Sequence, residues 1–193
     1  MRNAQIDFFE SLGESRARRL SHGGMESRGH RKRRRPFISG RPFHIVFKSS
    51  KARGALSFRG IKNHALVELA LKTQAKRHGV RLMSYVIMSN HLHIKIKASV
   101  KRGMQNFLRR IGSIIAQGVT KARKGRPFGK FWEALVFSRV LSSRSEELIL
   151  ERYFEANRIE AHLGYKARQV FLMKTRRKRS LNTLFLSKHL GFF

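Results

Sequence analysis

Residues 81–97 read RLMSYVIMSNHLHIKIK, and this stretch decides the fold. Its first part, residues 81–88, is nearly continuously apolar from Tyr85 onward, which is typical of a central β-strand. Ser89-Asn90 is a turn signal. Residues 91–97 then alternate between polar and apolar side chains, so we expect a second strand whose two faces differ. The stretch predicts two strands joined by a tight turn, with two histidines on one face.

The flanking sequence extends this pattern to a complete fold. Before this stretch, a strand is expected at residues 44–48 and a helix at 63–78. After it, we expect an amphipathic helix with its apolar stripe over 104–119, then a strand at 136–141 and a helix over 143–162. Ser143 and Glu146 form a capping-box signature at the start of that last helix. The order predicts an α+β fold: a ferredoxin-like split βαβ antiparallel sheet with helices on one face, plus a C-terminal helix. The sheet face that carries the histidines is expected to be open.

The charge balance indicates a polyanionic partner. The 193 residues include 43 Lys and Arg against 11 Asp and Glu, a formal net charge of +32. This excess is larger than solubility requires and favours nucleic acid. Hydrophobic residues make up 41% of the chain, which suffices for a core. The sequence contains no apolar run of about 18 residues, so we expect no membrane span. The N-terminus has no secretory signal pattern, so a cytoplasmic location is expected.

The distribution of acidic residues excludes several enzyme classes. Asp7 is the only aspartate, and no acidic residue lies between Glu68 and Glu133. Nucleases that hold two metals with clustered carboxylates, and glycosidases with paired ones, are therefore disfavoured. The chain has no cysteine, which excludes disulfides, thiolate zinc sites and cysteine catalysis. Chemistry on nucleic acid would have to use His, Tyr, Asn or Ser.

Basic blocks divide the chain into three parts. Residues 1–40 read as a basic, flexible leader, residues 41–164 as the folded domain and residues 165–193 as a basic C-terminal tail. Runs of like charge repel one another and bury nothing, so both ends are expected to be mobile until they meet phosphate. A non-specific electrostatic tether is an equally simple interpretation of these ends.

Two pairs of residues could carry chemistry. His91 and His93 are two apart on a predicted strand, so both imidazoles lie on one face about 7 Å apart, a workable first pair for a divalent metal. Tyr153 and Asn157 are four apart and share one face of the last helix. Taken alone, the first pair could be a solvated strand face and the second a core tyrosine with a polar neighbour. Neither pair is specific by itself.

Together the two pairs resemble a known family. Residues 88–93, Met-Ser-Asn-His-Leu-His, resemble the HUH motif (His, bulky apolar residue, His) of single-tyrosine HUH transposases, among them the REP-associated tyrosine transposases and related insertion-sequence transposases. Residues 153–157, Tyr-Phe-Glu-Ala-Asn, resemble the catalytic helix of that family. The resemblance covers roughly residues 40–164. The chain departs from the family at Ser89 and Arg158, where proline is common.

The resemblance implies a mechanism and its partners. His91, His93 and Asn157 would hold one Mg²⁺ or Mn²⁺, and Tyr153 would attack single-stranded DNA to give a 5′-phosphotyrosine and a free 3′-OH. Such a transposase nicks and rejoins DNA at hairpin-bearing sites, works as a homodimer and belongs to the bacterial, nucleoid-associated cytoplasm. Nitrogen ligands favour Mn²⁺, whereas Mg²⁺ is more abundant in cells. The sequence names no general base; His44 and His64 are candidates only.

Basic residues on the predicted strand, helix and leader are the candidate DNA contacts. They are Lys95, Lys97, Arg109, Arg110, Arg31, Lys32, Arg33, Arg34 and Arg35. Two further functions explain part of the pattern. One is a catalytically silent DNA-binding protein of the same fold, and the other is a basic RNA-binding protein, which explains the charge but not the two residue pairs.

Overall fold

The computed structural model describes residues 19–27, 29 and 34–175. The chain forms two compact units, Met1–Leu150 and Glu151–Phe193. The first unit contains a five-stranded sheet of order β1-β5-β2-β4-β3, in which every pairing is antiparallel. Its strands are β1 (Ser21–His22), β2 (Pro42–Lys48), β3 (Val80–Ile87), β4 (His91–Ala98) and β5 (Phe137–Val140).

The described helices are α3 (Ile61–Arg77), α4 (Lys101–Thr120) and α5 (Arg144–Leu163), with short 3₁₀ turns η2 (Met25–Ser27) and η3 (Gly54–Leu56). Four strands in the order β5-β2-β4-β3 reproduce the predicted ferredoxin-like sheet, so this fold prediction is confirmed. The additional strand β1 pairs with β5 and was not predicted, because two residues carry no readable alternation. The segment 165–175 is helical as well.

The predicted domain boundaries stay predictions. Residues 1–18, 28, 30–33 and 176–193, which include most of the predicted leader and tail, lie outside the described residues. Within the part of the chain that the structure describes, no helix is long and apolar enough to cross a membrane.

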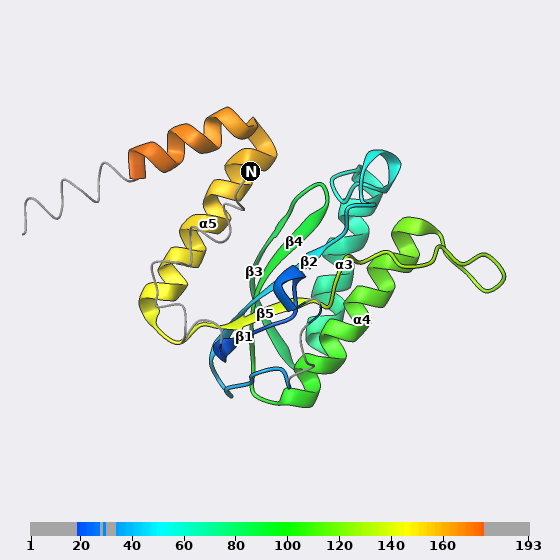
Figure 1. Cartoon of the computed structure of the whole chain (residues 1–193), viewed down its shortest axis with the longest axis horizontal. Helices are drawn as coiled ribbons and strands as arrows, with labels where there is room; N and C mark the ends of the chain where they lie inside the picture. The colour runs from blue at the N-terminus through cyan, green and yellow to red at the C-terminus, as the bar shows by residue number, and fades with distance from the viewer. Residues whose placement is uncertain (1–18, 28, 30–33, 176–193) are drawn as a thin grey trace, which may run out of the picture. The chain divides into compact units, whose positions relative to one another are not determined.

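The hydrophobic core lies between the sheet and the helices α3 and α4, which run side by side over one sheet face (Figure 1). Alternation along β4 sends Leu92, Ile94 and Ile96 into this core, and all three are fully buried. The stripe of α4 supplies Phe107 and Ile111 from the opposite side. Burying side chains of this size stabilises a fold by about 1.5–3 kcal/mol each. We call this sheet face the apolar face.

The two helices pack closely because α4 has a glycine at their contact. A Cβ atom at Gly118 would lie 2.4 Å from Leu66 Cδ2 on α3, so any larger side chain would displace Leu66. At its other end α3 is followed by Gly79, whose φ of +62° allows the chain to reverse into β3 without strain. These contacts fix β3 and β4 against the helices, and with them the position of the histidines.

The start of α5 is held by the predicted capping residues. The backbone N–H of Glu146 donates to Ser143 Oγ over 3.2 Å, and the N–H of Ser142 donates to the Glu146 carboxylate over 2.6 Å. The carboxylate thus reaches one residue further back than in a standard capping box. Gly164, with φ of +88°, follows the last helical residue, as predicted.

Candidate active site

The sheet face opposite α3 and α4 carries a pair of buried histidines on neighbouring strands. Strand β2 pairs with β4 so that His44 lies opposite Lys95 and Val46 lies opposite His93. Directly paired residues of an antiparallel sheet project to the same side, so His44 and His93 are diagonal neighbours on one face. His44 Nε2 lies 3.1 Å from His93 Nδ1, and both side chains are fully buried. We call this sheet face the polar face.

His91 completes a row of three imidazoles. Its ring centroid lies 4.8 Å from that of His93, with the rings nearly perpendicular, so the two histidines share a face as the alternation predicts. His91 is half-buried, and its Nδ1 lies 2.7 Å from Asn90 Oδ1. Because an amide oxygen only accepts hydrogen bonds, His91 donates from Nδ1 and carries its lone pair on Nε2.

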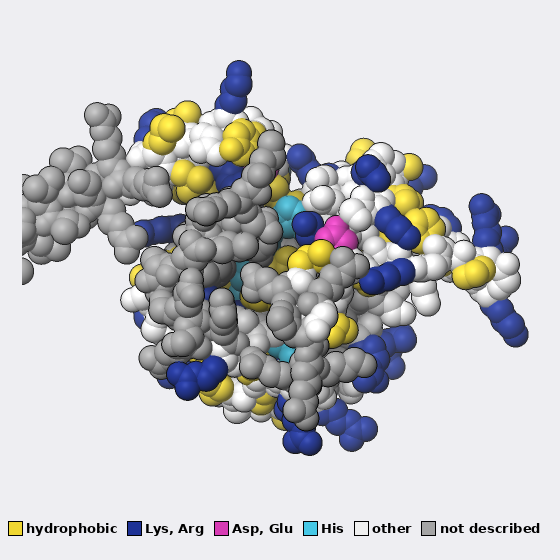
Figure 2. All heavy atoms as spheres, viewed as in Figure 1, with side chains coloured by type: hydrophobic (Ala, Val, Ile, Leu, Met, Phe, Trp, Pro, Cys, Tyr) yellow, Lys and Arg dark blue, Asp and Glu magenta, His cyan; other side chains and the backbone are white. Residues whose placement is uncertain are grey.

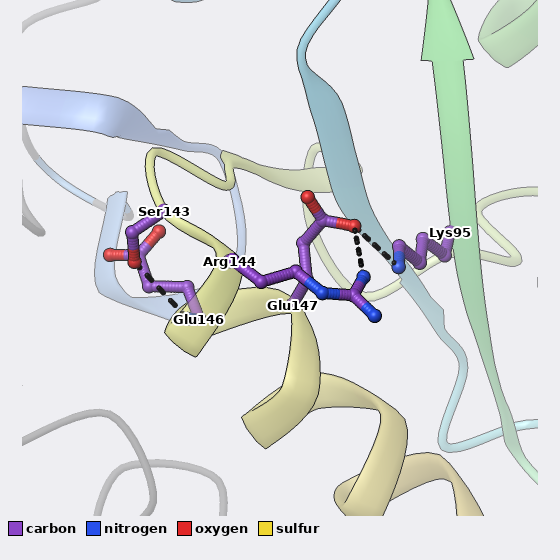
Figure 3. A network of polar contacts seen from close by, with 5 residues as sticks. All are labelled: Lys95, Ser143, Arg144, Glu146 and Glu147. Carbon is purple, nitrogen blue, oxygen red and sulfur yellow. Dashed lines mark hydrogen bonds and ion pairs between the residues drawn. The ribbon is translucent and has the colours of Figure 1, made fainter.

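Two buried cations flank His44 on the polar face. Lys95 on β4 and Arg139 on β5 are its direct cross-strand neighbours. Lys95 Nζ lies 2.9 Å from the Glu147 carboxylate, and Arg139 Nη2 lies 3.1 Å from the Glu146 carboxylate. Figure 3 shows Glu147 between Lys95 and Arg144, beside the capped first turn of α5.

These ion pairs correct one expectation from the sequence. The polar face was predicted to be open, yet His44, His93, Lys95 and Arg139 are all buried. The prediction was wrong here because the acidic first turn of α5 pairs with the two cations of the sheet. Burial, together with the positive charge of Arg139, lowers the pKa of His44 to about 3. His44 is therefore neutral at physiological pH.

The second unit holds the other predicted pair. Tyr153 and Asn157 lie one turn apart on α5, and both are buried, with exposed fractions of 7% and 2%. Burial raises the pKa of Tyr153, whereas a side-chain hydrogen bond with Asn157 and the charge of Arg168 lower it. The Arg168 guanidinium carbon lies 5.9 Å from the Tyr153 ring centroid. Arg168 Nη1 also forms an ion pair with Glu160 Oε2 over 2.7 Å. The phenol is thus buried and protonated, with a fixed cation at its ring.

The donor atoms suit one divalent ion better than a carboxylate metal cluster. Among the described residues, no three His, Cys, Asp or Glu side chains form a group that could hold a metal. In the first unit His91 and His93 supply two imidazole nitrogens, a neutral pair that Mn²⁺ accepts, and Mg²⁺ less readily. Asn157 lies in the second unit, and its role as an oxygen ligand stays a prediction. The Nδ1 atoms of both histidines have polar neighbours within hydrogen-bond distance, so each ring would bind an ion through Nε2. The residues fit the implied ion in their chemistry.

The predicted DNA contacts do not lie on one surface. Lys97 is exposed on the polar-face side of β4, whereas Arg109 and Arg110 are exposed on α4, which covers the apolar face. Lys95 is buried in its ion pair with Glu147. Figure 2 shows further Lys and Arg side chains projecting from the loop that follows α4. A role of these residues in DNA binding stays a prediction.

The basic block of the predicted leader is only partly described. Arg31, Lys32 and Arg33 lie outside the described residues, and Arg34 is exposed. Arg35 donates to the carbonyl oxygen of Val136 over 3.0 Å and to Ser138 Oγ. Burial lowers the pKa of Arg35 to about 10. Arg35 thus links the segment before β2 to β5 and to the residue just before β5. The sequence did not indicate this structural contact.

Comparison with known proteins identifies the family. The family model described as "Transposase IS200 like" matches residues 38–157, which is more than half of the chain. The chain belongs to the IS200-like transposase family. Its structure is similar to that of a REP-associated tyrosine transposase bound to a REP hairpin, with a TM-score of 0.56 and 12% identity over 70% of this chain and 76% of that one.

A second solved structure is also similar to this transposase. It is a protein assigned as a transposase from Deinococcus radiodurans R1, with a TM-score of 0.41 and 15% identity over 66% of this chain and 98% of that one. A search of curated proteins found no match.

Several charged residues around the candidate site residues were not singled out from the sequence. Glu146 and Glu147 were predicted only as favourable residues at the start of a helix, and Arg139 and Arg168 were not predicted to have a role, because only the fold brings each to its partner. His44 was noted only as an isolated candidate base. A usable signal was present: His44 stands on a short, otherwise apolar strand, and the predicted sheet order places that strand beside the strand with His93.

Proposed function

We propose that this transposase nicks and rejoins single-stranded DNA through a 5′-phosphotyrosine on Tyr153, with one divalent metal ion and at sites that carry hairpins. The observation that carries the proposal is the His91–His93 pair, whose rings share one face and whose Nδ1 atoms both face polar partners. Tyr153 and Asn157, one turn apart on α5, supply the nucleophile and an oxygen ligand.

The ion-binding residues would be His91 and His93 through Nε2, and Asn157 through its amide oxygen. When bound, Mn²⁺ or Mg²⁺ would supply Lewis-acid polarisation of the scissile phosphate. The chain's own contribution is to hold the two imidazoles in fixed orientations on a buried strand. Asn157 lies one turn from Tyr153 on α5 and its side chain lowers the pKa of that phenol, so one residue would serve both the ion and the nucleophile.

The covalent step uses the phenol oxygen of Tyr153. This oxygen attacks phosphorus, the bond from phosphorus to the 3′ oxygen breaks, the phenol loses its proton and the leaving 3′ oxygen gains one. The phosphodiester energy is kept in the tyrosine ester, so the reverse reaction rejoins a strand without an external energy source. Arg168 at the Tyr153 ring favours the phenolate and offsets part of the effect of burial.

Hairpin DNA is the proposed substrate class. The similar solved transposase is a complex with a REP hairpin, and this chain has a formal charge of +32. Exposed residues such as Lys97, Arg109 and Arg110 would contact phosphates, which position a nucleic acid without reading its sequence. A homodimer, implied by the family resemblance, belongs to the same proposal.

The test is formation of a covalent adduct. The full chain is incubated with a pool of labelled single-stranded oligonucleotides that carry hairpins with randomised flanks, in MnCl₂, MgCl₂ or EDTA. A protein–DNA adduct that survives denaturing electrophoresis is expected with either metal and not with EDTA. Tyr153→Phe should abolish the adduct, whereas the control Tyr165→Phe, at an exposed tyrosine of the next helical segment, should leave it unchanged.

Other outcomes favour the other functions. Hairpin binding by the wild type without an adduct under any metal would contradict the enzymatic proposal and favour a silent DNA-binding protein. Preference for RNA of the same hairpin sequences would favour an RNA-binding protein. An adduct that persists in Tyr153→Phe would place the nucleophile on another residue.

A further inference from the structure

His44 is a third buried histidine on the polar face, and the proposed reaction has no step for it. We propose that His44 is the positioning residue of His93: it holds the imidazole of His93 so that Nε2 is the metal-binding nitrogen. This inference rests on the proposed metal site and adds a residue to it.

A neutral imidazole has one ring nitrogen that carries a hydrogen and one that carries a lone pair. To bind an ion through Nε2, His93 must carry its proton on Nδ1, and that N–H needs an acceptor because the side chain is fully buried. His44 Nε2 lies 3.1 Å from this Nδ1, and in the proposed arrangement it accepts the hydrogen bond while His44 carries its own proton on Nδ1. Metal-binding histidines commonly donate their other ring N–H to such a partner, which fixes both tautomer and orientation.

The two metal-binding histidines obtain this partner in different ways. His91 donates to Asn90, its neighbour in the chain, over 2.7 Å. The partner of His93 comes from β2, 49 residues away, and depends on the register of β2 against β4. One orienting contact is thus local, and the other exists only when the sheet is formed.

The surroundings of His44 keep its ring in place. Its ring stacks on that of His93 with centroids 5.4 Å apart, and Phe137 contacts it edge-on at 6.0 Å. Lys95 and Arg139, its cross-strand neighbours, are ion-paired and buried. A fully buried ring between two strands and two fixed cations has little freedom to turn away from His93, as a positioning residue requires.

The experiment compares two substitutions at His44 in the full chain. Mn²⁺ binding is measured without DNA by the loss of the free-ion EPR signal. His44→Phe removes the acceptor, and we expect a 10- to 100-fold weaker affinity, the usual effect of losing such a partner. His44→Gln places an amide oxygen near the Nε2 position and should recover affinity to within a few-fold of the wild type. His64→Phe, at an exposed histidine of α3, is the control without effect.

The outcomes separate this inference from the proposed function. If the wild type binds Mn²⁺ and His44→Phe binds it equally well, the inference is wrong and the metal site stands. Equal weakening in His44→Phe and His44→Gln also overturns it, since hydrogen bonding would then not be the cause. If the wild type binds no Mn²⁺, the metal site itself fails, and the positioning role fails with it.

A measurement on the wild type covers the case in which His44→Phe does not fold. In ¹⁵N-labelled protein with saturating Mg²⁺, imidazole NMR shifts report which ring nitrogen of His93 carries the proton. We expect the proton on Nδ1. A proton on Nε2 would contradict the inference without any substitution.

Discussion

Alternate side chains of β4 enter two buried environments of different chemistry. Leu92, Ile94 and Ile96 face α3 and α4 and meet only the apolar core, whereas His93 and Lys95 face away from these helices and meet His44 and Glu147. Burial of the first group stabilises the fold directly. Burial of the second is costly unless every polar group finds a partner. The difference indicates that the apolar face maintains the fold, whereas the polar face carries buried charges and imidazoles that cost stability unless each has a partner, as expected of the site proposed above.

The largest effect is expected where a buried charge loses its partner. Glu146→Gln would leave Arg139 buried on the polar face without its carboxylate, and the free energy of unfolding should fall by about 3–5 kcal/mol. Urea denaturation of the full chain measures this loss. The double variant Arg139→Met/Glu146→Leu should recover most of the stability, because neither charge of this pair is left buried. Equal losses in the single and double variants would mean that the ion pair is not the cause.

A smaller loss in the free energy of unfolding is expected for a cavity on the apolar face. Ile94→Ala opens a cavity under α3 and α4 and should cost about 2–5 kcal/mol in urea denaturation. The folded variant should bind Mn²⁺ as the wild type does, because Ile94 points away from His93. Mn²⁺ affinity lowered to the extent expected for His44→Phe would contradict this separation of the two faces.

The smallest effect concerns a hydrogen bond at the edge of the apolar face. Tyr85 donates to Glu68 over 2.6 Å, and burial, together with this bond, raises the pKa of Tyr85 to about 12. Because the pKa of Tyr85 is higher in the folded protein than in the unfolded chain, protonated Tyr85 stabilises the folded state. This stabilisation is fully present below the pKa of the unfolded chain, near 10, and is lost as the pH rises from about 10 to 12. Tyr85→Phe should therefore flatten the decline in thermal stability over this range. An unchanged alkaline profile would show that Tyr85 does not cause it.

The sequence predicted one face far better than the other. Periodicity along residues 91–97 and 104–119 identified the strand, the helix and the side chains that meet, since hydrophobic burial follows from spacing alone. The same alternation placed His91 and His93 together. The partners of the polar face depend on strand register and on where α5 begins. The predicted sheet order places the strand of His44 beside that of His93, but neither the contact from His44 to His93 nor the one from Glu147 to Lys95 follows from spacing alone. Lys95 is an example: its spacing predicted a DNA contact, which stays a prediction, and gave no sign of its ion pair with Glu147.

The most direct test of the central claim is to find the residue that becomes linked to DNA. The adduct formed in Mn²⁺ is digested with nuclease and trypsin and analysed by mass spectrometry. Trypsin cleaves after Arg152 and Arg158, so Tyr153 lies in the peptide 153–158, whereas Tyr165 lies in 159–166. If Tyr153 is the nucleophile, a 5′-linked nucleotide is expected on the peptide 153–158. A nucleotide on any other peptide, or none in a reaction that cleaves the DNA, would contradict it.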